Sequence, residues 1–266
     1  MLPKNSTYSR NEVEKTKCIR GLHPSILTIW DIQEDLHYYY IMMEEIKSGD
    51  LLGYVNRTTS FSDNEIFYLF SQVVDAVEFL HQKKIAHRDL KLENFLITDT
   101  KKLKIIDFGF SLFVPDTGRV TQTSGTLHYA SPELILGLAH DPYKSDVWAM
   151  GVILYTFMYH RLPFRSDDNE VLKKRIKDGS YTLPRVEPPM KDDLIILLDS
   201  MLALDPDKRC GLAEIKSSQW YTGHLSATIP QDLTPRSEGD GAKEDGTKEE
   251  KSSIYDKLKF ALSIPK

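Results

Sequence analysis

The chain has 266 residues, of which 41% are hydrophobic and 27% charged, a composition typical of a globular protein with a sizeable core. Its net charge of −5 provides no basic field to attract nucleic acid, and two cysteines are too few for a disulfide framework or a zinc site. The opening residues MLPKNSTYSRN lack the apolar core of a signal peptide and no apolar run is long enough to cross a bilayer, so we expect a cytoplasmic protein that binds neither nucleic acid nor membrane.

The first 60 residues are predicted to form two helices and a β-hairpin. The helices are expected at residues 10–22 and 50–56, and the strands of the hairpin at residues 26–32 and 37–43. Gly21 would end the first helix, because glycine readily adopts the left-handed conformation found after helix ends.

A long helix is predicted over residues 61–82, where apolar side chains recur at helical spacing. Ser62 followed by Glu65 has the spacing of a capping box, which satisfies the backbone N–H groups at a helix start. This helix would deliver the chain to a short charged stretch.

That stretch is HRDLKLEN at residues 87–94, and the tripeptide DFG follows at residues 107–109. In this order and at loop-sized spacing they match the catalytic-loop and metal-loop signatures of protein kinases. A merely solvated charge run would not be embedded in apolar sequence, as residues 87–94 are. Short strands are expected at residues 95–98 and 103–106.

The residue types of the two motifs fit phosphoryl transfer, which depends on positioning and charge neutralisation. Asp89 would accept or orient the proton of a substrate hydroxyl, and Lys91 would stabilise the transferring phosphate. Asn94 and Asp107, at neighbouring strand ends, offer the hard oxygen ligands that Mg²⁺ prefers. Arg88 is a cation suited to an anionic partner, such as a phosphorylated loop residue.

The remainder of the chain is expected to be mainly helical. Residues 111–131 are polar and predict a functional or disordered loop. Further helices are expected at residues 145–159, 169–177, 191–204 and 212–220. Residues 226–266 form an acidic, low-complexity tail; residues 237–253 should be disordered, and residues 254–264 are either a weakly structured end or a docking helix.

Residues 10–225 resemble a eukaryotic protein kinase of the serine/threonine class, which carries the lysine of HRDLKxxN. Further motifs resemble the calcium/calmodulin-type group, and most closely the testis-specific serine/threonine kinase family. They are GDLL at 49–52, DFGF at 107–110, YASPE at 129–133 and DVWAMGVILY at 146–155. The resemblance implies an α+β, bilobal fold with an incomplete N-terminal β lobe and a mainly helical C-terminal lobe, with the kinase domain at residues 1–225.

The resemblance also implies an ATP site. Met43 would be the gatekeeper at the back of the adenine pocket, and Leu96 would form the floor of that pocket. Glu44 and Ile46 would offer backbone groups to adenine, and Asp50 would reach the ribose or a basic residue of the substrate.

Three structural features follow from the same resemblance. Thr126 would bond the catalytic aspartate and lysine. Glu133 and Arg209 would form a buried ion pair that anchors the substrate loop, and Asp146 would hold the backbone of the catalytic loop.

The partners implied are protein substrates and an upstream kinase. Glu93 and Asp50 are acidic residues near the substrate channel, which favours substrates with arginine or lysine before the target serine or threonine. The threonine usually phosphorylated in this group aligns with Gln122, so Thr121 and Thr123 are candidate replacements; alternatively, the loop needs no phosphate.

The chain departs from the family at its N-terminus, since it contains no G-x-G-x-x-G segment and no V-A-I-K-like lysine. The glutamate that normally pairs with this lysine is Glu14 by its distance from Pro24, or Glu12 if the helix is phased differently. The lysine itself would lie before Met1, and Lys4 is too close to take its place.

We therefore expect an N-terminally truncated kinase. The leading hypothesis is a protein serine/threonine kinase that transfers the γ-phosphate of ATP with the help of Mg²⁺. Because the glycine-rich segment and the lysine that normally hold the nucleotide phosphates are missing, we expect these 266 residues to have weak activity or none. The alternative is a pseudokinase that acts as a binding or scaffold module.

Overall fold

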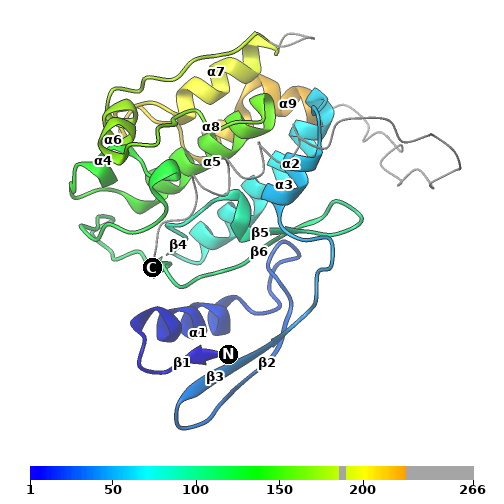
Figure 1. Cartoon of the computed structure of the whole chain (residues 1–266), viewed down its shortest axis with the longest axis vertical. Helices are drawn as coiled ribbons and strands as arrows, with labels where there is room; N and C mark the ends of the chain where they lie inside the picture. The colour runs from blue at the N-terminus through cyan, green and yellow to red at the C-terminus, as the bar shows by residue number, and fades with distance from the viewer. Residues whose placement is uncertain (186–189, 226–266) are drawn as a thin grey trace, which may run out of the picture. The chain divides into compact units, whose positions relative to one another are not determined.

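The structure is a computed structural model that describes residues 1–185 and 190–225. Its N-terminal part is a small antiparallel sheet of β1 (Leu2–Pro3), β2 (Ile29–Glu34) and β3 (Tyr38–Met43), in the order β1-β3-β2, with helix α1 (Thr7–Ile19) beside it (Figure 1). Helix α1 begins three residues before its predicted start, because Ser6 caps it by accepting a hydrogen bond from the Ser9 N–H.

Helix α3 (Asp63–Gln82) is the central support of the helical part. The predicted capping box is confirmed: the Ser62 hydroxyl accepts from the Glu65 N–H, and the Glu65 carboxylate accepts from the Ser62 N–H. The apolar face of α3 packs against α5 (Pro142–Tyr159), which is buried along nearly its whole length. Since α5 begins at Pro142, Asp146 lies in its second turn rather than in the first.

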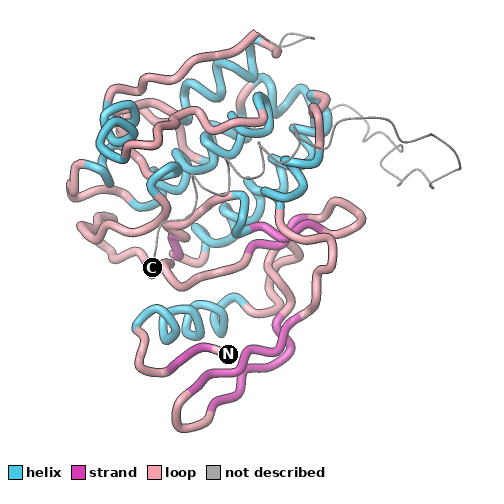
Figure 2. The backbone as a smooth tube through the Cα atoms, viewed as in Figure 1, coloured by secondary structure: helices cyan, strands magenta, loops and turns pink. Residues whose placement is uncertain are grey.

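Short elements between these helices carry the loops of the site. They are α2 (Leu51–Arg57), β4 (Ile85–Ala86), η1 (Leu92–Asn94), β5 (Phe95–Ile97), β6 (Leu103–Ile105), β7 (Leu112–Phe113), η2 (Leu127–Tyr129) and α4 (Pro132–Ile135). Strand β5 pairs with β6 and β4 pairs with β7, forming two small two-stranded sheets (Figure 2). The HRDLKLEN motif follows β4 and the DFG motif follows β6.

The C-terminal part consists of α6 (Asn169–Lys177), α7 (Asp192–Met201), α8 (Leu212–Ser217) and α9 (Gln219–Leu225). The single helix predicted at residues 212–220 is wrong, because Ser218 is extended and separates α8 from α9. Asp63, at the start of α3, accepts hydrogen bonds from Trp220 and His224 and thereby ties α9 to the body.

The α+β fold class is confirmed. The predicted tail at residues 226–266 lies outside the described residues, so the domain boundary stays a prediction. Within residues 1–185 and 190–225, no helix combines the length and hydrophobicity needed to cross a bilayer.

Candidate active site

The turn that starts the charged motif is held by one buried carboxylate. Asp146 is 1% exposed, and its two oxygens accept hydrogen bonds from the backbone N–H groups of His87 (2.9 Å) and Arg88 (2.8 Å). The Nε2 of His81 lies 2.9 Å from the same carboxylate. These contacts stabilise Arg88 at φ 68°, a left-handed conformation that residues other than glycine rarely adopt. The structure thus places Asp146 where the resemblance expected it.

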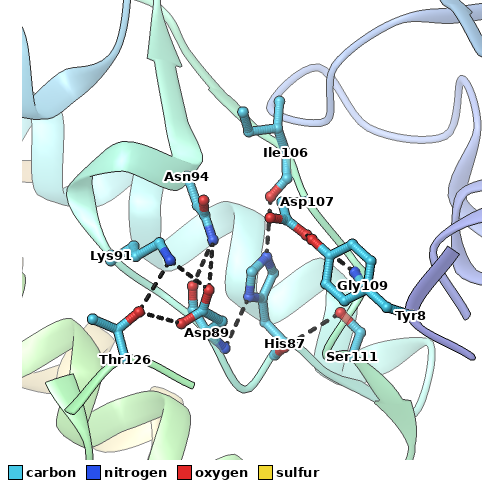
Figure 3. Close-up of polar contacts among 10 residues, drawn as sticks. All are labelled: Tyr8, His87, Asp89, Lys91, Asn94, Ile106, Asp107, Gly109, Ser111 and Thr126. Atoms are coloured by element: carbon cyan, nitrogen blue, oxygen red, sulfur yellow. Dashed lines mark hydrogen bonds and ion pairs between the residues drawn. The ribbon is translucent and has the colours of Figure 1, made fainter. Parts of the chain in front are cut away.

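Beyond this turn, four predicted residues meet in one hydrogen-bonded network (Figure 3). Lys91 Nζ donates to Asp89 Oδ2 at 2.7 Å and to Thr126 Oγ1 at 3.0 Å, and the Thr126 hydroxyl donates to Asp89 Oδ1 at 2.8 Å. Asn94 Nδ2 donates to the carbonyl oxygen of Asp89 at 2.8 Å. The Asp89 carboxylate therefore has a fixed orientation, with a cation and two neutral donors around it.

Gly125 permits this arrangement, and its role was not expected from the sequence. It has φ +106°, and a Cβ at this position would lie 2.5 Å from the carbonyl oxygen of Arg88. Only glycine lets the loop approach the charged motif closely enough for Thr126 to reach Asp89. The signal for this role in the sequence is the position of Gly125 directly before Thr126.

The two predicted metal ligands lie on paired backbone segments. The Ile106 N–H donates to the carbonyl oxygen of Asn94 at 2.9 Å, which brings Asp107 near the end of η1. The hydrogen bonds of Asn94 Nδ2 orient its amide so that Oδ1 points away from Asp89 (Figure 3). An amide oxygen and a carboxylate are hard oxygen donors, so the residues present fit Mg²⁺.

Helix α1 contacts the metal-loop motif directly. The Tyr8 phenol donates a hydrogen bond to Asp107, whose Oδ1 also accepts from the Gly109 N–H at 3.2 Å. Burial, and then the neighbouring carboxylate, raise the pKa of the Tyr8 phenol above its ordinary value, so it remains a neutral donor. No pattern in the sequence indicates this contact, because the two residues are 99 positions apart.

The assignment of Glu14 as the inward-facing glutamate of α1 is wrong. Its side chain is 60% exposed and pairs with Lys15 at 2.9 Å. The alternative, Glu12, faces the cavity beside Asp107, and its Oε2 is buried without a hydrogen-bond partner among the described residues. Burial, and then the charge of Asp107, raise the pKa of the Glu12 carboxyl to about 7. Packing of α1, rather than distance from Pro24, sets the phase of the helix.

A cavity of about 310 Å³ lies between α1 and the sheet and is largely apolar. Met43, Leu96 and Asp107 line it, so the structure brings the predicted gatekeeper, the pocket floor and a metal ligand around one space. A cavity with a few convergent polar groups is the usual form of a small-molecule site.

The other predicted nucleotide contacts lie outside the lining of this cavity. The Glu44 N–H donates to the Thr28 carbonyl oxygen at 2.9 Å, so the carbonyl of Glu44 is the backbone group left for adenine. Ile46 is half-buried after β3. Asp50 caps α2 by accepting from the Gly53 N–H at 2.7 Å, and its backbone bridges to Leu96.

Glu93 is an acidic group held close to Asp89. Its Oε2 is buried and has no hydrogen-bond partner within residues 1–185 and 190–225. Burial raises the pKa of the Glu93 carboxyl, and the nearby charges of Asp89 and Asp50 add to this increase while Lys91 opposes it. A buried, unpaired carboxylate is costly, and a cationic group would satisfy it.

Arg88 contacts the residue that stands in the place of the usual phosphothreonine. Its Nη2 donates to the carbonyl oxygen of Gln122 at 2.9 Å, and its Nη1 lies 3.5 Å from the Gln122 side-chain oxygen. Thr121 and Thr123 on either side are exposed. The loop is thus held near Arg88 by a neutral acceptor.

The predicted pair of Glu133 and Arg209 is buried and bidentate, with distances of 2.6 and 2.9 Å. Arg209 also donates to the carbonyl oxygens of Lys144 and Ala203. Although burial raises the pKa of Glu133, the hydrogen bonds and charge of Arg209 lower it below its ordinary value overall. This pair ties the end of the loop over residues 111–131 to the helical body.

The fold and the arrangement of these residues define a protein kinase domain. Residues 3–221 match the protein kinase domain family, and the chain belongs to that family. It is 34% identical over 99% of its length to the carbon catabolite-derepressing protein kinases of Candida glabrata and Saccharomyces cerevisiae. It is 36% identical over 77% of its length to an SNF1-related protein kinase catalytic subunit alpha of Arabidopsis thaliana.

The chain spans 42%, 42% and 40% of the length of these three relatives. The name of the Arabidopsis thaliana relative points to SNF1-related kinases. A probable serine/threonine-protein kinase of Dictyostelium discoideum, 32% identical over 84% of the chain, supports the serine/threonine class. These names do not support the expected placement in the calcium/calmodulin-type group or the testis-specific family.

Replacing Arg209 with methionine should lower the free energy of unfolding by about 3–5 kcal/mol, because the buried Glu133 carboxylate would lose its charge partner. Urea denaturation followed by circular dichroism measures this change. Lys173→Ala is the matched control: its surface pair with Glu170, at 2.7 Å, should contribute less than about 1 kcal/mol. Equal effects of the two variants would contradict a structural role for the buried pair.

Proposed function

We propose that this protein is a protein serine/threonine kinase that transfers the γ-phosphate of ATP to hydroxyl groups of protein substrates. The observation that carries this proposal is the network of Asp89, Lys91 and Thr126. It combines a carboxylate with a cation and with a threonine from the loop that would position a peptide.

In this proposal Asp89 orients the substrate hydroxyl and accepts its proton as the oxygen attacks the γ-phosphorus, while the bond from that phosphorus to the bridging oxygen breaks and ADP leaves with its electron pair. Lys91, 2.7 Å from Asp89, neutralises negative charge on the transferring phosphoryl group. Asn94 and Asp107 would hold Mg²⁺, which when bound neutralises the nucleotide phosphates. Met43 and Leu96 would enclose the adenine, with backbone groups of Glu44 and Ile46 at its edge and Asp50 near the ribose.

Glu12 supports descent from an active enzyme. Its buried, unpartnered carboxylate oxygen lies in the same cavity as Asp107, where a lysine ammonium would satisfy it. The 266 residues contain neither that strand lysine nor a glycine-rich loop. A binding module without catalysis is therefore the second candidate. Placement in the testis-specific family and a cytoplasmic location stay predictions.

The activity is tested on the 266-residue chain and on a fusion that adds the glycine-rich loop and strand lysine of a relative at its N-terminus. We expect phosphate transfer to a basic serine peptide by the fusion, at least about 10²-fold faster than by the chain alone. Asp89→Asn should lower the rate of the fusion by about 10²–10⁴-fold, because the proton acceptor is lost. A radiometric peptide assay measures both effects.

Asp116→Asn is the matched control for Asp89→Asn, since Asp116 is almost fully exposed in a surface pair with Lys84. It should leave the rate unchanged. If the fusion bound nucleotide but had no activity above that of its Asp89→Asn variant, the binding module would be favoured over the enzyme.

Glu93 should give the enzyme a preference for basic residues before the target hydroxyl. Glu93→Gln should lower kcat/KM for an arginine-containing peptide about 10-fold relative to its alanine counterpart, because a charge-assisted hydrogen bond is lost. The exposed Glu170 on α6 provides the control, Glu170→Gln, which should leave the ratio of the two peptides unchanged. An unaltered ratio in Glu93→Gln would rule out this role.

Thr121 and Thr123 are proposed as phosphorylation sites for an upstream kinase. A phosphate on either would lie beside Gln122, whose contact with Arg88 it could replace by a stronger, charge-assisted one. We expect mass spectrometry of the active protein to find the modification, and the double variant with alanine at both positions to be about 10-fold less active. If the active protein carried no phosphate on either threonine, this proposal would be wrong and Gln122 would remain the partner of Arg88.

A further inference from the structure

One face of helix α1 holds the loop that carries Asp107. Tyr8, Asn11, Glu12 and Lys15 are spaced at i, i+3, i+4 and i+7, so their side chains share one side of the helix. Tyr8 and Asn11 contact the metal-loop segment, residues 107–111, and Lys15 contacts Asn11. Of these four residues, Glu12 alone was expected from the resemblance to the kinase family.

Tyr8 covers the start of the segment. Its phenol donates to Asp107, and its ring lies so close to Gly109 that a Cβ there would overlap the ring. The ring also meets Phe110 edge-on, with centroids 5.1 Å apart and planes at 73°. Figure 3 shows the Tyr8 ring over Gly109 with its hydroxyl directed at Asp107. Together with the Gly109 N–H, the phenol occupies both lone pairs of Asp107 Oδ1, so a metal ion can bind this oxygen only after one of the two donors leaves.

Asn11 holds the remainder of the segment. Its Nδ2 lies within hydrogen-bonding distance of three carbonyl oxygens: those of Phe108 (3.3 Å), Gly109 (2.8 Å) and Ser111 (2.5 Å). Its Oδ1 accepts from Lys15 Nζ at 2.9 Å. The Lys15 side chain is only 4% exposed, so its ammonium is held in place and fixes which end of the amide faces the loop.

We propose that Tyr8 and Asn11 are positioning residues for the metal site, and that a metal ion must displace the Tyr8 phenol to reach Asp107 Oδ1. This inference depends on the proposed function, because it takes Asp107 as a metal ligand. Asn11 keeps the loop backbone in place while the phenol leaves, so the two residues act in opposite directions. Tyr8 opposes metal binding and Asn11 supports it.

The proposal is tested by titrating the 266-residue chain with Mn²⁺ alone and following free Mn²⁺ by electron paramagnetic resonance. Tyr8→Phe keeps the ring on Gly109 but removes the competing donor, so it should bind Mn²⁺ about 10-fold more tightly. Asn11→Ala should bind Mn²⁺ more weakly. In this variant the backbone N–H groups of Gly109 and Ser111 should also show faster hydrogen exchange with solvent than in the parent. A merely structural role for Tyr8 would not produce tighter binding.

Tyr40→Phe is the matched control, because it removes a similar phenol–carboxylate bond, 2.7 Å to Asp35, on the β2–β3 hairpin. Its Mn²⁺ affinity should equal that of the parent. Asp107→Asn should bind Mn²⁺ much more weakly than the parent. If it does and Tyr8→Phe binds no more tightly than the parent, the role of Tyr8 is overturned. If Asp107→Asn instead binds as well as the parent, the metal-ligand assignment itself fails.

Discussion

The buried carboxylate of Asp146 is the constraint on which the geometry of the site depends. A left-handed backbone at Arg88 costs of order 1–3 kcal/mol and persists only where its surroundings hold it. Two charge-assisted hydrogen bonds from the backbone at His87 and Arg88 supply this stabilisation from a position that water does not reach. The turn directs Asp89 toward the loop over residues 111–131, so a residue of helix α5 determines the orientation of the Asp89 carboxylate.

Beyond that turn, hydrogen bonds join residues 87–94 to the loop over residues 111–131. Thr126 reaches Asp89 only because Gly125 has no side chain, and the hydrogen bond fixes the carboxylate as well as the loop. The far end of the same loop is held by Glu133 and Arg209, whose bidentate contact replaces the water that both charges lost on burial. The polar groups in this region therefore position one another.

The metal-loop motif is held from the opposite side, by α1. Tyr8 and Asn11 contact backbone and carboxylate groups of residues 107–111, so a shift of this helix would move Asp107 as well. The orphaned oxygen of Glu12 lies in the same cavity. The position of α1, the orientation of Asp107 and the charge of the cavity are thus coupled through a few direct contacts.

The sequence by itself predicted the chemistry: motif order and spacing point to Asp89, Lys91, Asn94 and Asp107, and local patterns predicted the capping box of α3, which the structure confirms. These features depend on residues close together in the chain. Only the tertiary structure decided that Glu12 rather than Glu14 faces the cavity, that Tyr8 holds Asp107, and that one predicted helix is divided at Ser218. The physical reason is that helix phase and contacts between residues about 100 positions apart are set by packing, which local periodicity does not encode.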